Sequence, residues 1–184
     1  MSARKQTPYL SNETIYLRAP EPEDLEIMYE IENSPELWSY SSVTAPYSRY
    51  TLKQYIINSE HDIFSDRQLR LMIVSKESKE ILGIIDLSDF DPLHNRAAVG
   101  IVIMEKYRES GYAGQSLRLL CEYSFSYLHL KQLYSFIAYD NSSSLKLFTS
   151  CGFQESGILN DWIRDESGYK KAYILQLINQ SLIK

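Results

Sequence analysis

The spacing of hydrophobic and polar residues predicts short strands that alternate with amphipathic helices. Stretches of four to eight residues rich in β-branched and aromatic side chains are typical of strands, whereas apolar residues three or four positions apart are typical of helices. On this basis we predict strands at about 14–18, 69–75, 81–87, 97–104, 133–138, 153–162 and 169–177. The predicted helices cover about 21–33, 51–61, 114–128 and 142–151.

The order strand, helix, strand over 97–138 indicates a right-handed crossover. Such a crossover makes its two strands parallel neighbours, while the hairpin expected around 76–80 joins antiparallel ones. We therefore expect an α/β (α+β) fold whose mixed, mostly antiparallel central sheet has about seven strands and about four flanking helices. A local change from antiparallel to parallel pairing is a natural place for a ligand cleft.

The length of 184 residues fits one domain, because domains of roughly 100–200 residues are the usual unit. Residues 1–12 are polar and aperiodic, so we expect a flexible tail before a single domain at 13–184. Residues 37–49 are rich in Tyr, Trp and Ser and are expected to form a wall of a substrate site.

Charge and cysteine content narrow the range of partners. A net charge of -5 and a pI near 5.3 argue against nucleic acid and favour a cationic substrate. Cys121 and Cys151 are expected to be free thiols in a reducing cytoplasm. We find neither a signal segment nor an apolar run of roughly 18 residues, so we expect neither export nor membrane insertion. His61, His94 and His129 lack metal-ligand spacing, so we expect no metal. The oligomeric state stays open, homo-oligomers included.

The segment with the clearest chemistry is Arg108-Glu109-Ser110-Gly111-Tyr112-Ala113-Gly114, between a predicted strand and a predicted helix. A helix start offers unpaired N–H groups and a positive dipole end, which together suit a diphosphate. Gly111 permits a sharp turn, and Ala113 and Gly114 permit close approach of phosphate oxygens. Taken alone, the segment is equally compatible with a purely structural connection.

A second motif lies one strand later, where Asn141 and three serines precede a helix that ends at Gly152-Phe153. With both motifs in this order, the sequence resembles the GNAT superfamily of N-acetyltransferases, whose hallmarks are an R/Q-x-x-G-x-G/A loop and such an asparagine. The resemblance covers about 14–177 and is greatest to spermidine, diamine and related ribosomal-protein-type acetyltransferases. It implies a GNAT fold with two splayed parallel strands at the cofactor cleft.

The resemblance also implies acetyl-CoA as co-substrate. The backbone of Ile101 to Ile103 is then expected to pair with the pantetheine arm, the loop to hold the pyrophosphate, and Asn141 to lie near the reacting end. The residues expected to contact acetyl-CoA are Ile101, Val102, Ile103, Arg108, Glu109, Ser110, Gly111, Tyr112, Ala113, Gly114, Asn141, Ser144 and Phe148.

Attack of an amine on a thioester requires a neutral nitrogen, yet an alkyl amine has a pKa of about 10.4. A carboxylate can remove the proton, directly or through water. Asp86 and Asp89 lie at the end of a predicted strand and in the following turn, where spermidine-type enzymes also carry carboxylates. We assign proton removal to Asp86 and amine binding to Asp89; a solvated turn or cap is the alternative for both.

Several positions depart from the spermidine-type pattern. Phe148 replaces a tyrosine that protonates the leaving thiolate, so Tyr139 is the expected substitute. Thr44-Ala45 and Ala98 replace acidic residues, which weakens the case for a long polycation. Tyr40 and Tyr47 are expected to receive the amine through cation–π contacts, with helix packing as the alternative.

These observations predict transfer of an acetyl group to a primary amine of a small molecule, with spermidine, other polyamines and diamines as candidates. Two alternatives remain. In the first, the acceptor is a protein N-terminal amine or another amino-metabolite. In the second, which Phe148 suggests, the chain is a non-catalytic acyl-CoA-binding module.

Overall fold

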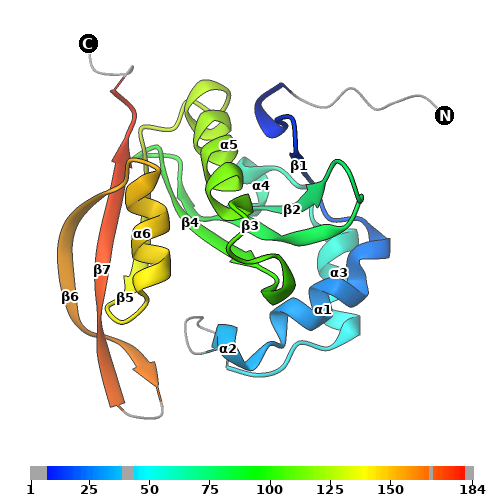
Figure 1. Cartoon of the computed structure of the whole chain (residues 1–184), viewed down its shortest axis with the longest axis horizontal. Coiled ribbons are helices and arrows are strands. Elements are labelled where there is room, and N and C mark those ends of the chain that lie inside the picture. The colour runs from blue at the N-terminus through cyan, green and yellow to red at the C-terminus, as the bar shows by residue number, and fades with distance from the viewer. Residues whose placement is uncertain (1–7, 39–43, 166–167, 181–184) are drawn as a thin grey trace.

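A computed structural model describes residues 8–38, 44–165 and 168–180 of the chain. Its centre is a seven-stranded sheet in the order β1-β2-β3-β4-β5-β7-β6 (Figure 1). All neighbouring strands are antiparallel except β4 and β5, which are parallel. The strands are β1 (Ile15–Arg18), β2 (Leu69–Ser75), β3 (Ile81–Asp91), β4 (Arg96–Ile103), β5 (Gln132–Ala138), β6 (Gln154–Asp165) and β7 (Gly168–Ile178). The predicted mixed sheet is thereby confirmed.

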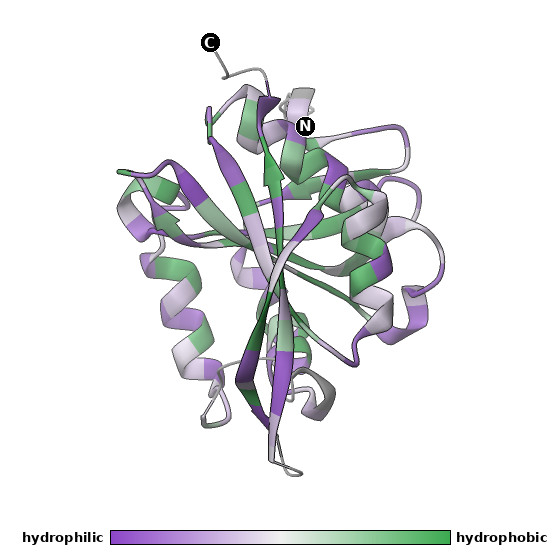
Figure 2. Cartoon of the chain, turned by 90° about the vertical axis from the view of Figure 1, so that its left-hand side faces the viewer, coloured by the Kyte–Doolittle hydropathy of each residue, from purple (hydrophilic) through white to green (hydrophobic). Residues whose placement is uncertain are grey.

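Helices cover both faces of the sheet. Four of those in the described residues have eight or more residues: α1 (Leu25–Glu32), α3 (Arg49–Asn58), α5 (Tyr112–Ser126) and α6 (Ser142–Ser150). Single turns form α2 (Pro35–Trp38) and α4 (Ile63–Asp66), and 3-10 turns lie at Pro8–Leu10, Pro22–Asp24 and Glu105–Tyr107. Figure 2 shows the resulting pattern, with hydrophobic strand segments inside and hydrophilic residues along outward helix surfaces.

Alternation along the strands assigns successive side chains to opposite faces. Leu71 and Ile73 of β2 belong to a hydrophobic cluster with α5, whereas Met72 and Val74 belong to a second cluster with α1 and α3. This two-sided burial explains why the predicted strand is a nearly continuous apolar run. It also fixes α1 and α5 on opposite sides of the strands that carry the site.

The parallel pair separates soon after it begins. Pairing of β4 with β5 is confined to Arg96↔Gln132, Ala97↔Leu133 and Ala98↔Tyr134, while β4 stays paired with β3 as far as Ile103. At the first separated position, the Ser135 hydroxyl donates to the carbonyl of Val99 at 3.0 Å. Beyond it, the two strands diverge and leave the β5-facing edge of β4 without a strand partner among the described residues.

Some boundaries differ from the prediction. Within the segment expected to be a flexible tail, Pro8–Leu10 form a 3-10 turn against α5, and the Asn12 amide donates to Gln115 Oε1 at 2.9 Å. β3 continues to Asp91 rather than ending near residue 87. The turn α4 was not predicted, because four residues are too few to show helical periodicity. Residues 1–7 of the expected tail lie outside the described residues.

Both cysteines are free thiols. Cys121 is buried and Cys151 half-buried, and burial raises the pKa of Cys121 to about 12. Across residues 8–38, 44–165 and 168–180, every helix is too short or too polar to cross a bilayer. The same ranges contain no group of three or more His, Cys, Asp or Glu side chains that could hold a metal ion.

Candidate active site

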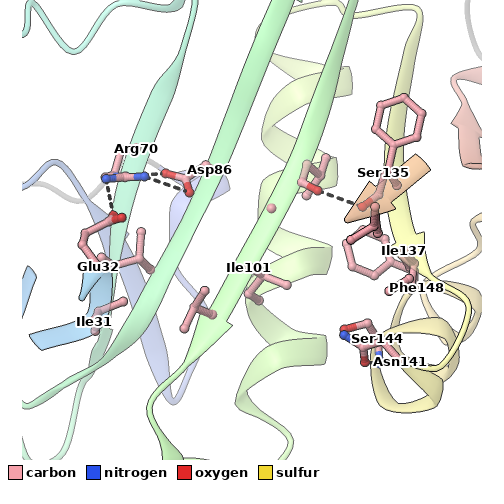
Figure 3. A pocket seen from close by; sticks show the side chains of 17 residues that line it. Ile31, Glu32, Arg70, Asp86, Ile101, Ser135, Ile137, Asn141, Ser144 and Phe148 are labelled. Atoms are coloured by element: carbon pink, nitrogen blue, oxygen red, sulfur yellow. Dashed lines mark hydrogen bonds and ion pairs between the residues drawn. The ribbon is translucent and has the colours of Figure 1, made fainter. Parts of the chain in front are cut away.

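Two cavities meet where β4 and β5 separate. The first, here called the outer groove, is a cavity of about 700 Å³ between β4, the start of α5 and one face of α6. The second, the inner cavity, measures about 310 Å³ and extends between β3, β4 and β5 to the end of α1 (Figure 3). Residues that line both are Ile101, Val102, Asn141 and Ser144. A ligand in the groove would therefore reach the cavity at this junction.

The outer groove takes its character from the start of α5. Gly111 is the N-cap, with a left-handed φ of 78°, and it offers the first amides of α5 no side-chain acceptor. A Cβ at Gly111 would have no heavy atom within 4 Å, so conformation and not space demands glycine. Uncapped amides beside a 700 Å³ groove are suited to phosphate oxygens.

Most residues predicted to contact acetyl-CoA line the outer groove. The exceptions are Ser110, whose exposed hydroxyl donates to the carbonyl of Arg108, and Phe148, which lines the inner cavity. The groove also has lining residues that the prediction did not include, namely Tyr107, Arg118, Ser143, Leu147 and Ser150.

Asn141 directs α6 toward the junction. Its side-chain Oδ1 accepts hydrogen bonds from the backbone N–H of Ser144 and from the hydroxyl of Ser143, both at 3.0 Å. This N-cap explains why an asparagine precedes the serine run. The cap places Ser144 where its side chain borders both cavities.

Three charged side chains from three different elements line the inner cavity. Arg70 of β2 donates from Nε to Asp86 Oδ1 at 2.7 Å and from Nη1 to Glu32 Oε1 at 2.5 Å (Figure 3). Glu32 is the last residue of α1, and Asp86 lies in the middle of β3. The side chains of Glu32, Arg70 and Asp86 are 15%, 23% and 26% exposed. We call these three residues the charged triad.

Burial and charge act against each other in the charged triad. Burial raises the pKa of Glu32, although the Arg70 guanidinium opposes the shift. Burial works against the positive charge of Arg70, yet Asp86 and Glu32 raise its pKa. Tyr55, whose ring lies 5.5 Å from the guanidinium, has a pKa raised to about 12 by burial. With both acids ionised, the triad carries one net negative charge, which suits a cationic ligand.

The other two residues assigned to catalysis lie outside the inner cavity. Asp89 is exposed, adopts a φ of 48° and lies in an irregular stretch of β3 between Ser88 and Asp91. Tyr139 is 55% exposed and stacks on Tyr173 with ring centroids 5.0 Å apart. Neither lines the cavity. The physical reason is local backbone geometry, since Asp89 lies in a bulged stretch of β3 and Tyr139 lies in the turn after β5.

Tyr47 and Tyr40 are the aromatic residues that the sequence assigned to the substrate. Tyr47 is held by Asn33, whose side chain bonds both its N–H and its carbonyl, and it packs against the cluster of α1 and α3. Tyr47 packs there and does not line the inner cavity, so its cation–π role stays a prediction. Tyr40 lies outside the described residues, as do positions 39–43 of the predicted substrate wall.

Glu32 and Arg70 were missed by the sequence analysis. Glu32 precedes Asn33-Ser34-Pro35 and looks like an ordinary polar residue at a helix end. Arg70 offered a signal, because it interrupts an apolar strand whose other residues are buried on one face or the other. A charged side chain in such a strand requires a partner, but the sequence does not identify which one.

Comparison with known proteins now identifies the family. The acetyltransferase (GNAT) domain family matches residues 14–154. The chain belongs to this family of N-acetyltransferases. It is 27% identical over 168 residues to spermidine N(1)-acetyltransferase of Vibrio cholerae, covering 90% of this chain and 95% of the relative. It is 26% identical over 172 residues to the uncharacterized N-acetyltransferase p20 of Bacillus licheniformis, covering 93% and 96%.

The fold is shared with solved structures. The spermidine N-acetyltransferase from Vibrio cholerae, solved in complex with CoA and spermine, superimposes with a TM-score of 0.81 at 24% identity. The match covers 91% of this chain and 97% of that structure. The predicted GNAT fold and N-acetyltransferase class are confirmed, and acetyl-CoA is the acetyl donor of this class.

Proposed function

We propose that this acetyltransferase acetylates a primary amine of a small molecule, and that polyamines or diamines are its substrates. The observation that carries the proposal is the opening of the outer groove into a cavity lined by Glu32 and Asp86. A donor in the groove and a cationic amine beside the two carboxylates would meet at the junction.

The outer groove fits acetyl-CoA, which supplies an activated acetyl thioester when bound. The β5-facing edge of β4 at Ile101 to Ile103 is available to an extended pantetheine arm, because β5 has already diverged. The amides that follow Gly111 would hold the diphosphate. Ser144 and Asn141, at the junction, would border the reacting end.

Within the inner cavity, Asp86 would accept the proton of the amine, directly or through water, so that the nitrogen can attack. Arg70 would keep Asp86 oriented, because two of its nitrogens face the same carboxylate. Glu32 would balance the charge of Arg70 and leave a net negative field for the amine.

The residue beside the leaving sulfur differs from the usual family pattern, because Phe148 replaces the tyrosine that protonates the thiolate. Phe148 is 3% exposed, lines the inner cavity and packs edge-on against Phe153, so this position supplies no proton. A thiol has a reference pKa of about 8.5, which lets the thiolate leave unprotonated. Ser144 borders both cavities, and its hydroxyl is the candidate hydrogen-bond donor to the departing thiolate.

The named relatives support a polyamine, whereas particular residues here favour a shorter amine. Acidic residues of the spermidine-type pattern are replaced by Thr44 and Ala45, which are exposed, and by Ala98, which is 8% exposed in β4. The inner cavity of about 310 Å³ accommodates a short aliphatic amine more readily than a folded peptide. The free thiols of Cys121 and Cys151 support a cytoplasmic location.

The proposal is tested by incubating the purified protein and acetyl-CoA with diamines, spermidine, spermine and a peptide with a free N-terminus. We expect thiol release and a mass increase of one acetyl group for a diamine or polyamine. Acetylation of the peptide alone would overturn the substrate class, and no product from any amine would overturn the proposed activity.

A matched pair of variants tests the role of Asp86. Asp86→Asn keeps the shape of the side chain but removes the proton acceptor, so kcat should fall by about 10²–10⁴-fold. Asp89→Asn is the matched control, because Asp89 is an exposed residue of the same strand and does not line the cavity. Asparagine also tolerates the positive φ of this position. Equal kinetics for Asp86→Asn and the unaltered protein would remove Asp86 from the chemistry.

A further inference from the structure

Arg118 lies at the end of the outer groove away from the junction. Along the groove wall formed by α6, Ser144 borders the junction, and Ser150 lies six residues further, about 9 Å at the rise of an α-helix. Arg118 faces this far end, since its Nη1 lies 3.8 Å from the sulfur of Cys151, the residue after Ser150. The groove thus has a reacting end and an arginine end.

The arginine folds back over Gly114, toward the start of α5. A Cβ placed on Gly114 would lie 3.4 Å from Nη2 and 3.5 Å from Nη1 of Arg118. Residues four apart share a helix face, and helical side chains lean toward the N-terminus. The absence of a side chain at Gly114 therefore lets the guanidinium reach the groove that the first turn of α5 lines.

Arg118 differs from four other arginines of the chain, which pair with carboxylates. Arg18, Arg49, Arg70 and Arg96 each bind a carboxylate. For Arg118, the polar contact within the described part of the chain is to a thiol sulfur, which is a weak acceptor, and no carboxylate there lies within 4.0 Å. An exposed guanidinium without an acid, at the rim of a groove in a chain of net charge -5, is available to an anionic ligand.

We propose that Arg118 binds the 3′-phosphate of the acetyl-CoA ribose and makes the enzyme select CoA over its 3′-dephospho form. The inference rests on the proposed function, in which the amides after Gly111 hold the diphosphate. The guanidinium lies between Gly114 and Cys151, on the α6 side of those amides, so it reaches a phosphate beside the diphosphate. Arginine suits this task because its planar fork binds two phosphate oxygens at once.

The test measures CoA and 3′-dephospho-CoA affinities by calorimetry for the unaltered protein, Arg118→Gln and Arg49→Gln. Arg49, paired with Glu26, does not line the groove and serves as the control. We expect the unaltered protein to bind CoA about 10-fold more tightly than the dephospho form, as one charge-assisted contact provides. Arg118→Gln should lose this preference by weakening CoA binding alone, and Arg49→Gln should keep it.

Equal weakening of both ligands by Arg118→Gln would overturn the inference and assign the arginine to the diphosphate. Unchanged affinity for both would overturn it as well. Failure of the unaltered protein to bind either ligand is a different result, because it would refute the proposed function rather than the role of Arg118. Circular dichroism of each variant checks that the fold is retained.

Discussion

The outer groove and the inner cavity adjoin, yet they are built in different ways. The groove is formed mainly by two continuous segments, 101–114 and 141–150, and much of what it offers a ligand is backbone. The inner cavity depends on side chains brought from distant positions, since Arg70 is 38 residues from Glu32 and 16 from Asp86. A few substitutions can therefore change the inner cavity while the outer groove stays intact.

Gly111→Val, which changes the backbone of the groove, is expected to have the largest effect on acetyl-CoA affinity. A β-branched residue at a φ of 78° is strained by about 1–3 kcal/mol, so the loop should shift and acetyl-CoA affinity should fall by about 10²-fold. Gly111→Asn is the control, because asparagine tolerates this conformation and its Cβ meets no atom within 4 Å. Calorimetry that gives unchanged affinity for the valine variant would contradict a backbone-built groove.

Arg70→Met tests whether the inner cavity depends on the ion pairs of Arg70 with Glu32 and Asp86. Removing the guanidinium leaves two carboxylates facing one another, which costs about 3–5 kcal/mol for a fully buried pair. The 15–26% exposure of these side chains reduces the expected loss to about 2–3 kcal/mol in urea unfolding at pH 7. Arg49→Met breaks an exposed ion pair with Glu26 and should change stability little. Equal stabilities of the two variants would show that the charged triad does not hold the cavity together.

Phe148→Tyr tests whether the lack of a proton donor at the junction limits the rate. A phenol at this position would place a proton donor beside the leaving sulfur, and kcat is expected to rise by up to about 10²-fold with little change in the KM for acetyl-CoA. Steady-state kinetics on the best amine measure the effect. Phe148→Leu, which keeps an apolar side chain without the hydroxyl, should show no gain. A tyrosine variant no faster than the natural enzyme would indicate that thiolate departure does not limit the rate.

The smallest effect concerns pH. Because burial raises the pKa of Glu32 above its ordinary 4.5, the folded protein holds that proton more tightly than the unfolded chain. The stabilising contribution of this group is complete below pH 4.5 and is lost as the pH rises through the raised value. Glu32→Gln should abolish this slope, which amounts to at most about 1.4 kcal/mol per pH unit.

Urea unfolding between pH 4.5 and 7 measures that slope. Glu30→Gln, an exposed position of the same helix, provides the matched control and should keep the slope of the unaltered protein. Parallel pH curves for Glu32→Gln and the unaltered protein would mean that Glu32 is not desolvated in the folded state.

The sequence by itself determined the elements and the two motifs that line the outer groove. Strand and helix periodicities are local, so seven strands and four longer helices could be placed to within a few residues. The loop at 108–114 and the cap at Asn141 are also local, because each works through the backbone of the segment that contains it. For that reason their positions beside the groove followed from their order along the chain.

Only the tertiary structure decided the inner cavity. Strand order and register bring Glu32, Arg70 and Asp86 into contact, and no spacing along the chain encodes that meeting. The same geometry leaves Asp89 and Tyr139 out of the cavity lining, because Asp89 lies in a bulged stretch of β3 and Tyr139 lies in the turn after β5. Sequence patterns show which residues can do the chemistry, whereas packing determines which side chains face the same space.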